Sequence, residues 1–239
     1  MKFTTLSRLL VFNRHSFVAA FIPCICLLCL SGCFTPAKLD KWVAHDYQDV
    51  SLTPVKSKLD YLGVMDTIPS LDNRVSSSVK KSGKLLPLLF YWHQDYKYIC
   101  TLNARIPVNN FITAFTAYAG SKRLKQKLNG RRVELTINNV PHVLTLEDNE
   151  HMIWFILYAY SWTYLDILPG SDDLVLSYKI IDGGSDAKDG TIIVPDANKR
   201  LRVKMFQSPK KAIGEYLEQY NDNIAAMSRK AVDQLITAL

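Results

Sequence analysis

Residues 152–168 read MIWFILYAYSWTYLDIL, an unusually aromatic stretch. Aromatic residues favour strands over helices, because their rings pack well on a pleated, half-buried surface. We therefore expect this stretch to form one strand, in which alternate side chains point to opposite faces of a sheet. The face that begins with the first tryptophan would carry Trp154, Ile156, Tyr158, Tyr160, Trp162 and Tyr164.

The polar tips of these aromatic side chains suit a surface that is partly in contact with water. A membrane span is disfavoured by the three tyrosines and by Ser161, Thr163 and Asp166. If helices cover the opposite face, the aromatic face is left for a ligand or a protein partner. The alternative is that both faces are buried and the rings are part of the core. The predicted binding residues are Trp154, Tyr158, Tyr160, Trp162 and Tyr164.

The sequence before the aromatic stretch predicts a strand, a helix and a hairpin. Apolar residues alternate from Leu86 to Tyr98, which indicates a strand. They then recur at spacings of three and four from Val108, which indicates a helix that runs toward Leu128 and ends at the following Asn-Gly. Residues 133–137 alternate again, and Asn138-Asn139 is a plausible turn into a partner strand over 140–146.

The sequence after the aromatic stretch predicts further strands and a long helix. We expect strands over 174–181, 192–194 and 201–206, with an Asp-Gly loop at 182–190. Ser208 can cap the last helix and Pro209 suits its first turn. Its apolar stripe would lie across a sheet, or alternatively dock a partner; the stripe consists of Ile213, Leu217, Tyr220, Ile224, Met227, Ala231, Leu235 and Ala238.

Together these elements predict an α+β domain over residues 85–239. Its mixed or antiparallel sheet would have about six strands, with one helix early and one long C-terminal helix. Residues 33–84 are weakly periodic and close with a stretch rich in Ser and Lys at 76–84. Such a composition buries little apolar area, so we expect a tether with possible short local structure.

The N-terminus predicts a secretion signal. Its first 32 residues contain Lys2, Arg8 and Arg14 and no acidic residue, and residues 17–30 are apolar apart from one proline. Fourteen residues are too few for the roughly 20 that a spanning helix needs. We therefore interpret residues 1–32 as a signal peptide.

The apolar run ends in Leu30-Ser31-Gly32-Cys33, which resembles the lipobox of bacterial lipoprotein precursors. The resemblance implies cleavage after Gly32 and acylation of Cys33, so that the acyl chains hold the protein in a membrane. In Gram-negative lipoproteins an Asp after the lipidated cysteine favours retention in the inner membrane, and this chain has Phe34. The resemblance therefore implies an outer-membrane lipoprotein that faces the periplasm. Cys100 would remain as a lone, buried thiol.

The charge of the chain gives no indication of nucleic-acid binding. The net charge is +7, and it falls to +4 when the three basic residues of the signal are removed. One local cluster follows the predicted helix: Lys122, Arg123, Lys125, Lys127, Arg131 and Arg132. These cations are interpreted as a solvated helix end or as a contact for anionic lipids or acidic partners.

No motif for catalysis, a metal or a cofactor is present. Glu150-His151 lacks the second histidine of a zinc-protease helix, and the acids of loop 182–190 do not follow the calcium-loop spacing. The remaining histidines are widely spaced. We therefore expect no catalytic residues, no metal and no cofactor.

The sequence thus favours a non-catalytic, lipid-anchored component that binds or assembles with other envelope proteins. One alternative is a carrier of lipid or another apolar ligand, with a cavity lined by Trp154, Tyr158 and Trp162. Another is an envelope hydrolase, which would bring a nucleophile, a base and an orienting acid within hydrogen-bond reach.

Overall fold

The computed structural model describes residues 35–48, 50–69, 74–86, 89–155, 158–183, 185–204 and 206–239, without the side chains of 185–187. Cys33 and Gly32, the predicted lipidation and cleavage residues, lie outside these ranges. Residues 36–239 form one compact unit. None of the helices in the described ranges is both long and apolar enough to span a membrane.

The first sheet has four strands in the order β1-β4-β7-β8. Strand β1 (Leu62–Asp66) pairs in parallel with β4 (Arg132–Asn139). Strands β7 (Leu174–Asp182) and β8 (Ser185–Val194) continue the sheet with antiparallel pairing. Alternate residues of β4 and β7 are fully buried, as expected for a sheet that is covered on one face.

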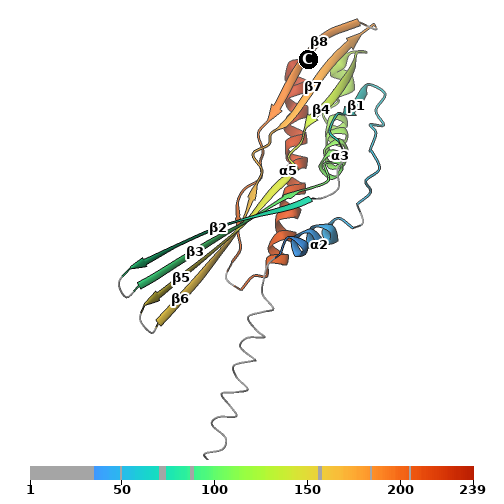
Figure 1. The fold of residues 1–239 in the computed structure, drawn as a ribbon. Helices are drawn as coiled ribbons and strands as arrows, with labels where there is room; N and C mark the ends of the chain where they lie inside the picture. The colour runs from blue at the N-terminus through green and yellow to red at the C-terminus, as the bar shows by residue number, and fades with distance from the viewer. Residues whose placement is uncertain are drawn as a thin grey trace, which may run out of the picture. The chain divides into compact units, whose positions relative to one another are not determined.

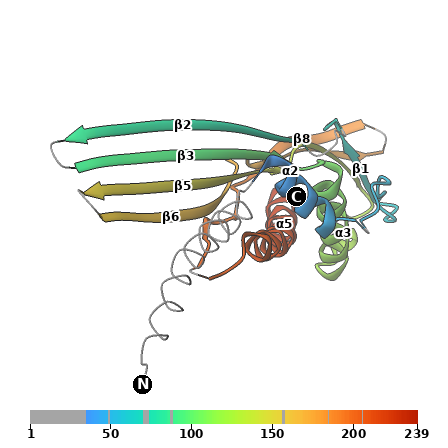
Figure 2. The same ribbon diagram turned by 60° about the horizontal axis from the view of Figure 1, so that its bottom comes forward.

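The second sheet has five strands in the order β2-β3-β5-β6-β9, and all its pairings are antiparallel. Its long members are β2 (Arg74–Leu86), β3 (Leu89–Thr101), β5 (Val143–Phe155) and β6 (Tyr158–Pro169). The short β9 (Leu201–Arg202) pairs only with the end of β6. Figures 1 and 2 show these four long strands running well beyond the helices.

The described residues form four helices: α2 (Pro36–Asp46), α3 (Arg105–Ser121), α4 (Leu124–Leu128) and α5 (Pro209–Ala238). Helices α3 and α5 pack against each other on the same side of the strands (Figure 2). The N-cap prediction is confirmed, because Ser208 Oγ accepts a hydrogen bond from the Lys211 amide at 3.2 Å. The predicted apolar stripe of α5 is buried from Ile213 to Leu235.

The α+β class is confirmed, and the described part of the chain has two sheets in place of one and nine strands in place of about six. The helix predicted over 108–128 is interrupted, because Arg123 adopts a left-handed conformation (φ 56°) between α3 and α4. The predicted loop 182–190 is largely strand β8, with a turn at Gly183 (φ 58°). The strand predicted at 201–206 is only the two residues of β9.

The hairpin predicted across Asn138-Asn139 is wrong, because β4 and β5 belong to different sheets. The connecting residues enter the core: Val140 is fully buried, and Tyr220 of α5 donates a hydrogen bond to the Pro141 carbonyl. This tertiary contact directs the chain from one sheet to the other, and alternation of apolar residues carries no information about it.

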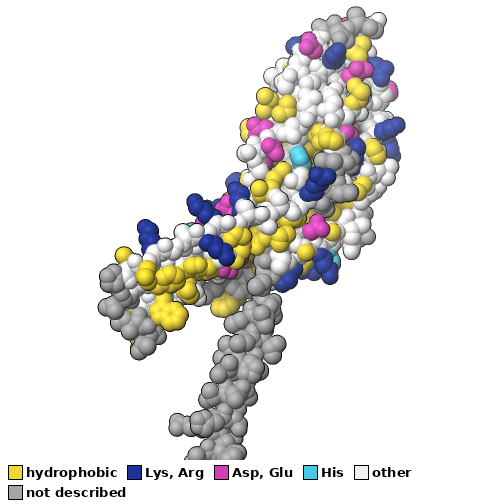
Figure 3. Space-filling model, in the orientation of Figure 1, with side chains coloured by type: hydrophobic (Ala, Val, Ile, Leu, Met, Phe, Trp, Pro, Cys, Tyr) yellow, Lys and Arg dark blue, Asp and Glu magenta, His cyan; other side chains and the backbone are white. Residues whose placement is uncertain are grey.

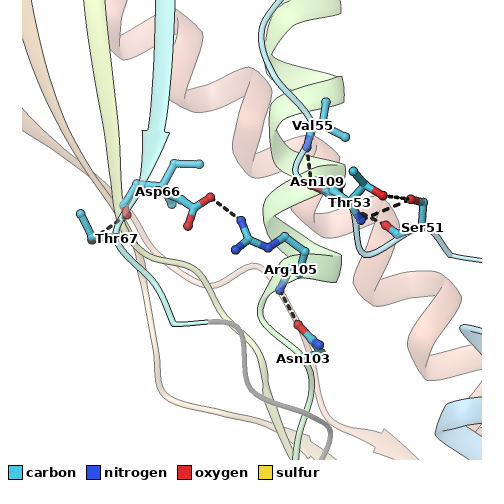
Figure 4. A network of polar contacts seen from close by, with 9 residues as sticks. Ser51, Thr53, Val55, Asp66, Thr67, Asn103, Arg105 and Asn109 are labelled. Carbon is cyan, nitrogen blue, oxygen red and sulfur yellow. Dashed lines mark hydrogen bonds and ion pairs between the residues drawn. The ribbon is translucent and has the colours of Figure 1, made fainter.

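The predicted start of the folded domain at residue 85 is also wrong. The stretch at 76–84 is part of β2 and pairs residue by residue with β3, and α2 buries Leu39 and Val43 completely. Polar contacts hold the intervening segment (Figure 4): the Asn109 amide bonds backbone groups of Ser51, Thr53 and Val55 at 3.0–3.1 Å. These contacts replace the expected tether from residue 36 onward.

Arg105 fastens β1 to the start of α3 within the same network. Its Nη1 lies 2.6 Å from Asp66 Oδ2, and its amide bonds Asn103 Oδ1 at 2.9 Å (Figure 4). Both partners of the ion pair are mostly buried, which strengthens their attraction relative to an exposed pair.

Candidate functional site

The aromatic stretch forms a hairpin of β5 and β6 instead of the single strand that we expected. Phe155 pairs with Tyr158, and the chain reverses between them. Directly opposed residues of an antiparallel pair share a face, so Tyr158, Tyr160, Trp162 and Tyr164 still lie on one face. Trp154 pairs with Ala159 and therefore lies on the opposite face, which corrects the predicted set.

The distal part of the second sheet, which we name the extension, comprises residues 80–86, 89–95, 149–155 and 158–164. Strand pairing runs without a shift across all four of its strands. One face, the histidine face, carries Tyr91, His93, His151, Tyr160, Trp162 and Tyr164. The other, the core face, carries Phe90, Trp92, Met152 and Trp154 and continues the side of the sheet that enters the core at Tyr98 and Leu146.

Stacked rings cross the histidine face from strand to strand. The centroids of His93 and His151 are 4.4 Å apart with an interplanar angle of 12°, and those of His151 and Trp162 are 5.0 Å apart at 9°. Tyr91 Oη lies within hydrogen-bond distance, 2.9 Å, of His151 Nδ1. Cross-strand ring pairs of this kind stabilise a sheet that has little helix cover.

The histidine face also brings together a serine, a histidine and an acid. Ser82 Oγ lies 3.5 Å from His93 Nδ1, and His93 Nε2 lies 2.6 Å from Asp95 Oδ1. The second contact has ion-pair distance but not hydrogen-bond direction, because Asp95 Oδ1 has no hydrogen-bond partner among the described residues. The group therefore meets the distance criterion for a triad, but the base is poorly oriented by its acid.

Large apolar and aromatic side chains are exposed at the far end of the extension. Tyr158 and Tyr160 are 78% and 69% exposed, Leu85 is 82% exposed and Trp154 is 52% exposed. Phe155 and Leu86 add to the same end, and Figure 3 shows hydrophobic side chains gathered there. An exposed apolar patch of this kind is typical of an interaction surface.

The five predicted binding residues differ in their surroundings. Trp162 is half-buried in the stack, while Tyr164 is 45% exposed and has the Arg202 guanidinium 5.3 Å from its ring centroid. The carrier hypothesis requires Trp154, Tyr158 and Trp162 to line one cavity. Trp154 lies on the other face from the remaining two, so this cavity is not formed.

Two acids on or beside the extension have shifted pKa values. Burial, and then repulsion by Glu150, raises the pKa of Asp148 to about 6. Burial also raises the pKa of Asp166, but hydrogen bonds and charge from Arg200 and Arg202 outweigh it and leave that pKa below its ordinary value. Asp166 therefore links the base of β6 to two arginines: Arg202 in β9 and Arg200 in the segment just before β9.

The predicted basic cluster lies where α3, α4 and β4 meet. Lys125 Nζ lies 3.0 Å from Asp60 Oδ2, and Lys122 Nζ lies 3.9 Å from Asp233 Oδ1. Arg131 donates to the Leu128 carbonyl at 3.0 Å. Arg123, Lys127 and Arg132 are exposed. Part of the cluster is thus balanced by acids of the same chain.

One feature of the extension was missed by sequence reasoning. The histidines are widely spaced in the sequence, and strand pairing nevertheless places His93 beside His151. Cys100 is fully buried, as predicted, and burial raises its pKa to about 12. Among the described residues, no cluster of three or more His, Cys, Asp or Glu side chains is arranged to hold a metal ion.

Searches with family models, known proteins and solved structures found no match to this chain.

Proposed function

We propose that this chain is a lipid-anchored, non-catalytic component of the bacterial envelope that binds or assembles with other envelope proteins through the extension. The observation that carries the proposal is the exposed aromatic and apolar end of the extension, which none of the helices α2 to α5 covers. Anchoring follows from the likeness of residues 30–33 to a lipobox, with Cys33 as the acylated residue. Phe34 favours the outer membrane, with the folded unit facing the periplasm.

The chemistry of the exposed residues supports a protein partner. Tyr and Trp are enriched where protein interfaces gain most of their binding energy, because each ring buries a large area and loses little conformational entropy. Tyr158, Tyr160 and Trp154 meet this description. The flanking Lys80, Lys81 and Lys84 would form the polar rim of such an interface.

Two measurements test this proposal. Mass spectrometry of the protein from its host membrane should give a chain that begins at an acylated Cys33. A photo-crosslinking residue at Tyr160 should then capture a defined set of envelope proteins. The same residue at Ile193, which is also exposed but lies on β8 of the first sheet, should not capture them. An uncut chain without acyl groups, or equal capture at both positions, would contradict the proposal.

A second candidate function is an envelope hydrolase, which the proximity of Ser82, His93 and Asp95 favours. His93 Nδ1 would act as the base toward Ser82 Oγ. The unsuitable direction of the Asp95 contact and the stacking of His93 on His151 place this candidate second. Labelling of the full chain by a serine-directed fluorophosphonate, lost in Ser82→Ala and retained in Ser78→Ala, would favour the hydrolase over the binding component.

A further inference from the structure

The second sheet has unpaired edges on both sides of the extension. Strand β2 pairs with β3 along its whole length, and no described strand pairs with its other edge. On the opposite side, β9 covers β6 only at Asp166 and Ile167, and the Leu165 carbonyl accepts from the Val203 amide. Residues 158–164 of β6 therefore pair with no described strand on that side. Unpaired edges are templates for pairing with another chain.

We propose that the occupant of these edges is a second copy of this chain: β2 of one copy pairs with β6 of the next and continues the sheet. This inference deepens the proposed function, because it names one partner of the assembly. The contact satisfies the unpaired edges of both strands, and a pair of copies joined in this way retains one free β2 edge and one free β6 edge for further copies.

Strand direction supports this pairing. Three antiparallel steps separate β2 from β6, so the two strands run in opposite directions. A second copy in the same orientation therefore adds its β2 antiparallel to β6 and extends the existing pattern. Identical orientation also suits copies that are tethered to one membrane. Antiparallel pairing of β6 with β6 would instead point the two extensions in opposite directions.

The charges of the two edges also favour unlike pairing. The distal part of β2 carries Lys80, Lys81 and Lys84, whereas residues 158–164 of β6 carry no charged side chain. Pairing β2 with β2 would oppose lysines, which is destabilising. Pairing β2 with β6 avoids this repulsion and places the exposed tyrosines of β6 on the same face as Lys80 and Lys84, whose aliphatic stems can pack beside them. Because the contact joins two different edges, it generates a closed ring or an open chain of copies.

Cysteine pairs test the contact in the full chain in its host membrane. Val79 of β2 and both Ser161 and Thr163 of β6 lie on the core face of the sheet, so cysteines there can meet across the new contact. Val79→Cys combined with Ser161→Cys or Thr163→Cys should give, after mild oxidation, a ladder of species beyond the dimer. Each single variant should give no ladder.

The parental chain is the control for the native cysteines, and Val79→Cys with Ile193→Cys is the matched control. Ile193 is exposed on β8, an edge strand of the first sheet, so this pair should give no ladder. Ser161→Lys added to the Val79→Cys, Thr163→Cys variant should reduce the ladder several-fold, because it places a cation beside the lysine edge. Ser161→Glu should not reduce it.

Three outcomes would overturn the inference. One is that both double variants are folded and membrane-bound but remain monomeric. Another is a dimer formed by the β6 single variants alone, which indicates pairing of β6 with β6. A third is a ladder of equal strength in the Ile193 control. If the ladder is absent but capture of other proteins at Tyr160 persists, the homotypic contact fails and the proposed function stands.

Discussion

The imidazole rings of His93 and His151 stack across β3 and β5 with centroids 4.4 Å apart, and Trp162 continues the stack on β6. His151 is the central member, since it contacts both rings and lies within hydrogen-bond distance of Tyr91. Stacked cross-strand pairs are worth about 0.5–1.5 kcal/mol each. The stack therefore contributes to the stability of a sheet region that has little other cover.

We expect His151→Ala to lower the free energy of unfolding by about 1–3 kcal/mol, because both stacking contacts and the Tyr91 contact are lost. His151→Phe keeps an aromatic ring and should lose less. Urea unfolding at constant pH measures both values. The control is His45→Ala, an exposed position on α2, where a change within about 0.5 kcal/mol is expected. Equal values for all three variants would show that the stack is energetically neutral.

Asp166→Asn should destabilise the attachment of β9 to β6. The carboxylate is almost fully buried and pairs with Arg200 and Arg202, whose side chains are more than half exposed. The two arginines can be hydrated after the change, so we expect a loss of about 1–3 kcal/mol, below the usual cost of breaking a fully buried pair. Urea unfolding at pH 7 measures this loss, and Asp189→Asn, an exposed acid on β8, is the control.

The pH dependence of Asp166 follows from the direction of its shift. Its pKa is lower in the folded chain than its ordinary value of 3.8, so the unfolded chain binds more protons near that pH. The stabilisation by the ionised Asp166 carboxylate is therefore complete above the ordinary pKa of 3.8 and is lost as the pH falls through the lower pKa of the folded chain. Asp166→Asn should therefore show a shallower loss of stability below about pH 4 than the parental chain. Parallel acid-unfolding curves would contradict this assignment.

The fold class and the last helix were predictable because their signals are local. The N-cap of Ser208 and the buried stripe that begins at Ile213 depend only on spacing within one element. The extent of β2 was not predictable in this way. A strand rich in Ser and Lys resembles a linker, and what makes it a strand is its pairing with β3, a non-local contact.

The candidate site was partly predictable for the same reason. The prediction that Tyr158, Tyr160, Trp162 and Tyr164 share one face is confirmed, since it depends on strand pleating alone. Trp154 was assigned to the wrong face because apolar residues run through the point where the chain reverses, without a turn motif to mark it. His93 and His151 are brought together by register, which the sequence of either strand does not specify.

Asp148→Asn should stabilise the protein at neutral pH. The pKa of Asp148 is raised to about 6 from 3.8, so the folded chain holds a proton that the unfolded chain has lost between these values. Stability therefore falls as the pH rises through this window. The full shift corresponds to about 3 kcal/mol. Because the side chain is only half-buried and screened by solvent, we expect a gain of about 1–2 kcal/mol at pH 7.

Unfolding of Asp148→Asn and the parental chain at pH 3.5 and pH 7 measures this effect. The two should be nearly equal at pH 3.5, where the carboxyl is protonated in the folded chain. Glu150→Gln removes only the repulsive neighbour and should give a smaller gain at pH 7. If Asp148→Asn raised the free energy of unfolding equally at both pH values, the cause would be the new amide group and not the loss of the charge.

Substitutions on β6 should separate binding from stability. Tyr158 and Tyr160 are mostly exposed, so the double variant Tyr158→Ser with Tyr160→Ser should change the free energy of unfolding by less than about 1 kcal/mol. Because these rings supply the proposed contact surface, capture of envelope proteins by a photo-crosslinker at Phe155 should fall strongly. Trp162→Ala, on the same face, should lose about 1–3 kcal/mol of stability because it removes a member of the stack. Unfolding curves and crosslink yields from the same preparations distinguish the two effects, and full capture by the double tyrosine variant would assign binding to another surface.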